Sequence, residues 1–277
     1  MSHRTPVPRP SPASEDREAK TSHEILQEEI AHGLGELNRP TSGLLLSGLS
    51  AGLDVGFSLF FMGVMLTLLL PAAPEPLTTL LVANMYSVGF IFVILGRSEL
   101  FTEHTTLAVF PLLNGDATAG QVGRLWGLVY MSNLVGATLA AVMAVVLGPR
   151  LGAIDPEALT TIGGHLVEAD TGTMFLSAVV AGWLMGLLSW LASASRETMG
   201  RILVVWLITT GMGLAGLHHC IVGTAEVLAA VFVGGGEVTM GDYGRFLLWS
   251  TLGNTLGGVT MVAVLKYGHA VQSSDAD

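Results

Sequence analysis

The chain has 277 residues, of which 51% are hydrophobic and only 12% are charged. Soluble domains carry about 25% charged residues, so this composition excludes an ordinary soluble globular protein and indicates one that crosses a membrane several times. The net charge of −10 argues against a nucleic-acid partner, and the single cysteine, Cys220, excludes an internal disulfide framework.

The chain begins with a polar segment. Residues 1–22 are rich in proline, serine and charged residues and are expected to form a disordered cytoplasmic tail. Residues 23–39 carry apolar side chains near helical spacing and predict a short amphipathic helix, lying on the membrane surface or against a neighbouring subunit. These apolar side chains are Ile25, Leu26, Ile30 and Leu34.

Six apolar segments follow, within a transmembrane domain expected over residues 40–269. Each is long enough to cross a bilayer, which takes about 20 residues in a helix. Polar and charged residues interrupt the second segment at 96–105 and the fifth near 216–224. The six segments lie roughly at 41–70, 77–113, 121–148, 173–194, 200–232 and 243–268.

Charge distribution predicts how these segments are oriented. The connection at 149–172 is acidic and is expected to be an outward-facing loop, and residues 270–277 are expected to form a cytoplasmic tail. Most Lys and Arg residues lie on the other side from that loop; Arg150 and Arg245 are the exceptions, and Arg97 falls within the first interruption. The positive-inside rule therefore predicts that both termini are cytoplasmic.

The two halves of the chain share one order of features. In each half, an uninterrupted span precedes an interrupted one, and a span containing Asn-x-x-Gly comes third, with Asn133 and Asn254 as the two asparagines. Three spans per half is an odd number, so the halves would form an inverted repeat, with a substrate site near the bilayer midplane where the interruptions meet. Charged groups at that depth normally face a bundle interior or an aqueous cavity. An ordinary extramembrane loop at 96–105 is the alternative.

Three motifs resemble those of the formate/nitrite transporter family. Residues 99–102, Glu-Leu-Phe-Thr, look like the family's acidic-Leu-Phe-Thr loop in the broken second helix. Residues 126–136, with Trp126 and an Asn-Leu-Val-Gly run, look like its third helix. His219 and residues 253–258 look like parts of its fifth and sixth helices. The resemblance covers roughly residues 25–268.

The resemblance implies an aquaporin-like fold of six helices per protomer, a homopentamer with one pore in each protomer, and transport of formate, nitrite or hydrosulfide. It implies that His219 is the central pore histidine and that Thr102 faces it. An imidazole there can stabilise an anion or lend it a proton. Leu100, Phe101 and Phe90 are further candidates for pore constrictions, although Phe90 lies in no motif, and ordinary packing is the alternative for all three.

Four residues are expected to support the breaks. Asn133 and Asn254 are expected to satisfy backbone groups of the broken helices rather than to bind substrate. Glu99 is expected to orient its loop by capping backbone N–H groups. His218 is expected to face a different surface from His219, because neighbouring residues of a helix point about 100° apart.

Some residues depart from the family pattern. The lysine that usually precedes the fourth helix is absent, and polar residues 170–173 stand there instead. Charged or titratable residues that are uncommon among family members lie near the breaks. The resemblance therefore implies the family's fold for this chain more strongly than it implies the family's substrate. These residues are Arg97, Glu103, His104, His218 and Glu226.

The sequence therefore predicts an all-α polytopic protein of a bacterial-type inner (plasma) membrane that moves a small monovalent weak-acid anion or its conjugate acid, with or without a proton. An aquaporin-like channel for a neutral solute or ammonium, and a non-conducting scaffold, remain alternatives. The chain lacks His-Glu-x-x-His, a cysteine pair, a Gly-x-Ser-x-Gly elbow and a phosphate-binding loop, so no enzyme, metal or cofactor is expected.

Overall fold

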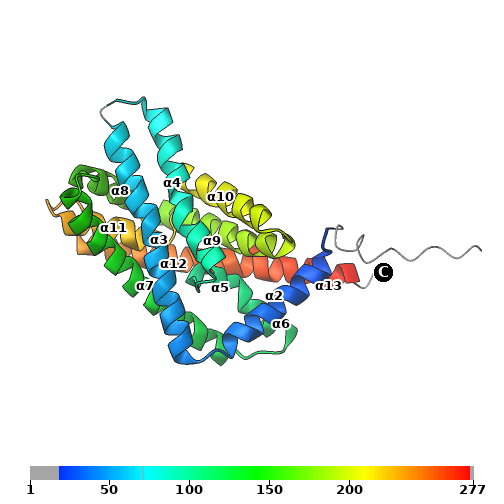
Figure 1. Cartoon of the computed structure of the whole chain (residues 1–277). Coiled ribbons are helices and arrows are strands. Elements are labelled where there is room, and N and C mark those ends of the chain that lie inside the picture. The colour runs from blue at the N-terminus through cyan, green and yellow to red at the C-terminus, as the bar shows by residue number, and fades with distance from the viewer. Residues whose placement is uncertain (1–18, 71, 275–277) are drawn as a thin grey trace, which may run out of the picture.

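The computed structural model describes residues 19–70 and 72–274, and its regular elements in these ranges are all helices (Figure 1). The tail expected over residues 1–22 lies outside them except for its last four residues. Within these described ranges, five helices are long and apolar enough to cross a membrane. They are α3 (Thr41–Leu69), α4 (Glu75–Gly96), α7 (Ala119–Arg150), α9 (Thr171–Ala194) and the continuous helix Met240–Gln272.

That last helix has three parts. It begins as α12 (Met240–Leu256), continues as a π-helical segment (Gly257–Val264) and ends in α13 (Leu265–Ser274). The helix therefore runs five residues past the boundary expected at residue 269.

The interrupted spans break over shorter stretches than the polar residues suggested. After α4, only residues 97–100 leave the helical conformation before α5 (Phe101–Leu107) and α6 (Val109–Asn114) follow. Arg97 ends α4 with a φ of 55°, the left-handed conformation that commonly closes a helix. The second break separates two shorter apolar helices, α10 (Thr198–Leu214) and α11 (Val222–Val233).

The connection at 149–172 is not the simple loop that was expected. It contains α8 (Pro156–Glu168), which starts with proline at its first position, where a missing N–H costs nothing. One face of α8 is buried and packs against α11. The buried residues of that face are Ala158, Leu159, Ile162, Gly163 and Leu166.

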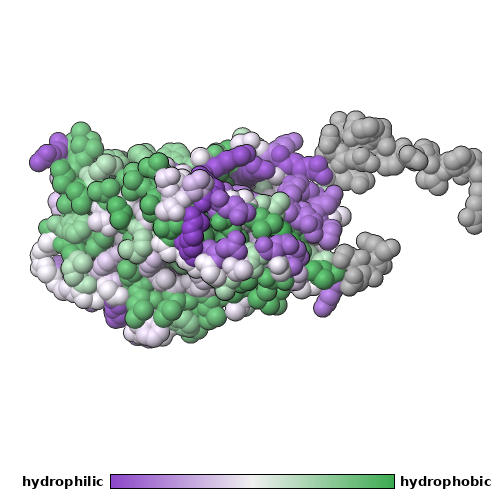
Figure 2. Space-filling view, turned by 90° about the horizontal axis from the view of Figure 1, so that it is seen from below, coloured by the Kyte–Doolittle hydropathy of each residue, from purple (hydrophilic) through white to green (hydrophobic). Residues whose placement is uncertain are grey.

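The N-terminal amphipathic helix is α2 (Ser22–Leu37), which begins in a capping box between Thr21 and Glu24. Its apolar face packs against α6, α9 and α13, so the two ends of the described chain lie at the same end of the bundle (Figure 1). On the face shown in Figure 2, hydrophobic residues cover much of the surface, and hydrophilic ones gather toward the end where α2 and α13 lie.

Glycines allow two pairs of spans to approach closely. A Cβ added to Gly136 of α7 would lie 2.5 Å from the carbonyl oxygen of Leu49 on α3. A Cβ on Gly257 would lie 2.0 Å from the carbonyl oxygen of Val179 on α9. Small residues at such crossings let helix backbones pack directly against each other in a membrane. Glycine–backbone contacts of the same kind thus bring α3 against α7 and α9 against the last span.

Candidate functional site

Two buried asparagines hold the two breaks. Asn133 on α7 accepts the N–H of Phe101 at 2.8 Å and donates to the carbonyl oxygens of Gly48 and Glu99, each at 2.8 Å. One side chain thus bonds the backbone on both sides of Leu100. The prediction that Asn133 supports backbone groups matches these three hydrogen bonds.

Asn254 makes the same three bonds in the second half. It accepts the N–H of Cys220 at 2.8 Å and donates to the carbonyl oxygens of His218 and Ala178 at 2.9 and 2.8 Å. His219 therefore occupies in the second break the position that Leu100 occupies in the first.

The breaks meet at His219 and Thr102. The Nε2 atom of His219 lies 2.8 Å from the hydroxyl oxygen of Thr102, and both residues are buried. The N–H of Val222 donates to Nδ1 of His219 at 3.3 Å, which makes Nδ1 an acceptor and assigns the proton of the neutral ring to Nε2. Nε2–H then donates to Thr102, and the Thr102 hydroxyl proton is left without an acceptor among the described residues.

Of the three apolar side chains expected to narrow the pore, one has a ring in contact with His219. Phe90 of α4 lies edge-on to the His219 ring, with centroids 5.3 Å apart. Leu100 is fully buried within the first break. The Phe101 ring packs instead against Tyr130 and Trp126, at centroid distances of 4.8 and 6.1 Å. Phe90 thus reaches His219 although no motif marked it.

The expected capping role of Glu99 is wrong. Its carboxylate forms a salt bridge with Arg39 at 2.7 Å and a hydrogen bond with His104 on α5, rather than bonding loop N–H groups. Its own N–H donates to the hydroxyl of Ser47 at 3.1 Å. Glu99 therefore joins the α2–α3 junction to the first break.

His218 has a different environment from its neighbour. Its Nδ1 lies 2.9 Å from the hydroxyl of Ser177 on α9, and its Nε2 lies 3.0 Å from the carbonyl oxygen of Leu166 on α8. Both ring nitrogens are thus used within the protein, which agrees with a supporting role and a surface distinct from that of His219.

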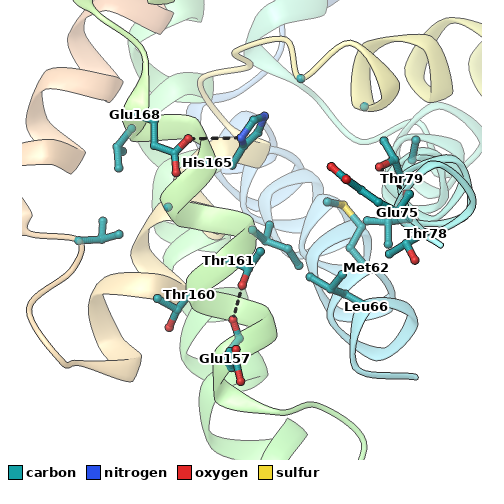
Figure 3. Close-up of a pocket in the computed structure, with 18 of the residues that line it drawn as sticks. Met62, Leu66, Glu75, Thr78, Thr79, Glu157, Thr160, Thr161, His165 and Glu168 are labelled. Carbon is teal, nitrogen blue, oxygen red and sulfur yellow. Dashed lines mark hydrogen bonds and ion pairs between the residues drawn. The ribbon is translucent and has the colours of Figure 1, made fainter. Parts of the chain in front are cut away.

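Each break adjoins a cavity that sequence reasoning did not predict. A cavity of about 1020 Å³ lies between α3, α4 and α8 and reaches Ala215 and Gly216 in the second break (Figure 3). Glu75 of α4 points into it, and His165 and Glu168 of α8 lie opposite. Its acidic residues are Glu75, Glu157, Glu168, Glu237 and Asp242.

A smaller cavity of about 270 Å³ adjoins the first break. It lies between α2, α4 and α9 and includes Ser98 and Glu99. Unlike the larger cavity, it mixes both signs of charge. Its other charged or titratable residues are Glu28, Glu29, His32, Arg97, Glu103 and Arg201. Among the residues that the structure describes, no three His, Cys, Asp or Glu side chains form a group that could hold a metal ion.

Comparison with known proteins identifies the family to which this chain is related. The family model described as formate/nitrite transporter matches residues 23–268. The chain is 33% identical over 254 residues to the inner membrane protein YfdC of Escherichia coli (strain K12), covering 90% of this chain and 78% of that relative.

Solved structures share the fold. An FNT family ion channel superposes with a TM-score of 0.78 at 23% identity, over 88% of this chain and 98% of the other. A pentameric formate channel with formate bound superposes with a TM-score of 0.67 at 22% identity, over 86% and 98%. The predicted all-helical membrane architecture and the predicted resemblance are confirmed: the chain belongs to the formate/nitrite transporter family.

Proposed function

We propose that this protein is a membrane channel or transporter for small monovalent weak-acid anions of the formate, nitrite or hydrosulfide class. The observation that carries the proposal is the 2.8 Å contact between His219 Nε2 and Thr102, which joins two broken helices in the middle of the bundle. Broken helices that meet at membrane depth are typical of substrate pathways.

The chemistry of this contact suits a weak-acid anion. Removing an anion from water costs several kcal/mol or more unless hydrogen bonds replace its hydration. The free hydroxyl proton of Thr102 can supply one such bond, and the positive end of α11, which begins at Val222, adds favourable electrostatics. His219 can hold or release a proton beside the passing anion. Phe90 and Leu100 narrow the path on either side, so that substrate passes the polar pair without bulk water.

The assembly and orientation form part of the proposal. We infer a homopentamer with one pore per protomer, because the superposed formate channel is pentameric. Both termini are inferred to be cytoplasmic, since Lys and Arg are enriched on that side and α2 packs against α13. In this orientation the acidic cavity faces the extracytoplasmic side and the smaller cavity faces the cytoplasm.

Stopped-flow uptake into proteoliposomes tests the proposal. Formate, nitrite, hydrosulfide, ammonium and glycerol would be compared at pH 5.5 and 7.5, for wild type and His219→Phe. Anion flux that rises at pH 5.5 and falls in the variant, with the oligomer intact on size-exclusion chromatography, supports it. Wild-type vesicles that pass only glycerol or ammonium would refute it.

The acidic cavity favours a second candidate, a channel for ammonium or a neutral solute. Carboxylates that line a vestibule attract cations and repel anions at low ionic strength. The two candidates differ in the response to Glu75→Gln combined with Glu157→Gln. Those changes would raise formate flux at low salt if anions enter there, but would lower ammonium flux if cations do.

A further inference from the structure

An arginine without a partner lines the smaller cavity, beside the first break. Arg201 lies in the first turn of α10, and its guanidinium makes no hydrogen bond or ion pair with any residue that the structure describes. Its Nε atom is buried as well. A buried N–H group without an acceptor is costly, and a guanidinium keeps its charge at every working pH. Arg201 therefore needs an acceptor that the described part of the protein does not supply.

The carboxylates that line the same cavity do not act as this acceptor. Four glutamates are found among its described lining residues, and three of them are bound elsewhere. Glu28 pairs with Lys20 at 2.6 Å, and Glu99 pairs with Arg39 at 2.7 Å. Glu29 accepts hydrogen bonds from two serines of α9, and burial raises the pKa of its carboxyl. These three carboxyl groups thus leave the charge of Arg201 unpaired.

The remaining glutamate and arginine of the cavity are unpaired too. Glu103 of α5 and Arg97 at the end of α4 make no side-chain hydrogen bond or ion pair within the described residues. With Arg201, the three unpaired side chains carry two positive charges and at most one negative charge. The cavity therefore keeps an excess of positive charge, which one monovalent anion would neutralise.

The cavity lies on the way to the contact between Thr102 and His219. It includes Ser98 and Glu99 of the first break, and Glu103 directly follows Thr102 in the chain. Its volume of about 270 Å³ accommodates a small anion together with several water molecules, since one water takes about 30 Å³ in the liquid. In the proposed orientation this cavity faces the cytoplasm, so an anion entering from there would reach Arg201 before Thr102.

We propose that Arg201, assisted by Arg97, binds a small monovalent oxyanion in this cavity, at a position separate from the Thr102–His219 contact. The inference rests on the proposed function, because the oxyanion is the substrate held at the cytoplasmic entry. A planar guanidinium presents parallel N–H groups that match a ligand with two oxygen atoms. Formate and nitrite have two oxygen atoms, whereas chloride and hydrosulfide offer one acceptor atom. The site is thus expected to favour formate and nitrite.

Binding of formate to the full-length oligomer in detergent is measured by NMR titration at low ionic strength. Arg201→Gln removes the charge, and Arg201→Lys keeps the charge but loses the planar fork. Arg97→Asn removes the second charge, since asparagine tolerates the left-handed backbone at this position. Thr102→Val separates binding at the pore contact from binding in the cavity. Arg196→Gln is the matched control, because it removes an exposed arginine that does not line the cavity.

We expect the formate affinity to fall about tenfold in Arg201→Gln, the effect of lost charged hydrogen bonds, and about threefold in Arg201→Lys and Arg97→Asn. Arg196→Gln should bind like wild type, and Thr102→Val should retain the binding that depends on Arg201. Chloride should compete with formate more weakly than nitrite does. Unchanged affinity in Arg201→Gln, or equal competition by chloride and nitrite, would overturn the proposal. Tighter binding of inorganic phosphate than of formate would also overturn it and assign the cavity to a dianion.

Formate uptake into inside-out and right-side-out membrane vesicles then tests the position of the site. The half-saturating formate concentration should rise about tenfold in Arg201→Gln for entry from the cytoplasmic face, and should change little for entry from the other face. An equal rise from both faces would contradict a site at the cytoplasmic entry. Wild type that binds formate through Arg201 but conducts none of the anions would refute the proposed function, whereas conduction that does not depend on Arg201 would refute only this inference.

Discussion

Asn133 and Asn254 make the same set of three hydrogen bonds in the two halves of the molecule, each accepting one backbone N–H and donating to two carbonyl oxygens around a helix break. Both are fully buried. Both N–H groups of each side-chain amide are thus used within the protein, so neither asparagine has a donor left for a substrate anion.

Replacing either asparagine by leucine should destabilise the protein strongly. Each substitution removes three hydrogen bonds and leaves buried backbone groups unpaired, which is worth roughly 3 kcal/mol or more. Thermal unfolding in detergent measures the effect, with Asn38→Leu as the control, because Asn38 is exposed at the end of α2. The unfolding temperature is expected to fall by a similar amount in Asn133→Leu and Asn254→Leu. A loss in one alone would contradict equivalent roles for the two breaks.

Close approach of α3 and α7 predicts a second stability effect. Gly136→Ala places a Cβ 2.5 Å from the Leu49 carbonyl oxygen, which belongs to the backbone and cannot rotate away. Overpacking of this kind costs about 1–3 kcal/mol. Gly123→Ala on the same helix meets no atom within 4 Å and should be neutral or stabilising by about 0.5–1 kcal/mol. Equal unfolding temperatures for the two variants would refute the role of this crossing.

Thr102→Val tests the hydroxyl beside His219. The substitution preserves volume and β-branching but removes the group that receives the Nε2–H and that can donate to an anion. Formate flux should fall about fivefold, and the buried Nε2–H that is left without a partner should lower the free energy of unfolding by about 1–3 kcal/mol. Thr105→Val is the control on the same helix, since its hydroxyl bonds only the backbone carbonyl of Thr102. Flux lost equally in both variants would point to general damage of α5.

The burial of Glu29 on α2 predicts that the free energy of unfolding of this protein depends on pH. It is almost fully buried and accepts hydrogen bonds from Ser189 and Ser193 on α9. Burial raises the pKa of its carboxyl above the ordinary value. A raised pKa means that the folded state prefers the protonated carboxyl, so its favourable contribution is present at low pH and is lost as pH rises through the folded pKa.

Glu29→Gln mimics the protonated form at every pH. Its unfolding temperature should exceed that of wild type by a margin that grows between pH 5 and pH 8. The neighbouring Glu28→Gln removes an exposed ion pair with Lys20, which is worth little, and should show no such trend. A margin for Glu29→Gln that stays constant over this range would show that protonation of Glu29 is not linked to folding.

Local sequence signals predicted much of this molecule. Apolar runs are long and contain few charges, so the spans could be placed within a few residues, and the asparagines of the two Asn-x-x-Gly motifs could be assigned to the breaks. Polarity was a poorer guide to backbone conformation. Glu103 and His104 suggested a break through residue 105, yet both lie within helix α5. His104 there bonds Glu99, so its polarity is satisfied without leaving the helix.

Other features depended on contacts distant in sequence. The partner of Glu99 is Arg39, 60 residues earlier, and nothing local to the loop identifies it. Phe90 looked like ordinary packing until the fold brought its ring to His219. Helix α8 does have a local signal, since Pro156 is followed by apolar residues at helical spacing. The acidic residues of the same connection, which are typical of an outward-facing loop, obscure that signal.

The packing of α2 against α13 has a consequence for biosynthesis. Ile25, Leu26 and Ile30 share one buried cluster with Phe110, Trp190 and Ala270. Helix α2 therefore cannot complete its contacts until Ala270 of α13 has been made. Until then its apolar side must rest on the lipid surface, for which its amphipathic pattern suits it. Closure of the contact between α2 and α13 is expected to follow the insertion of the spans that lie between them in the chain.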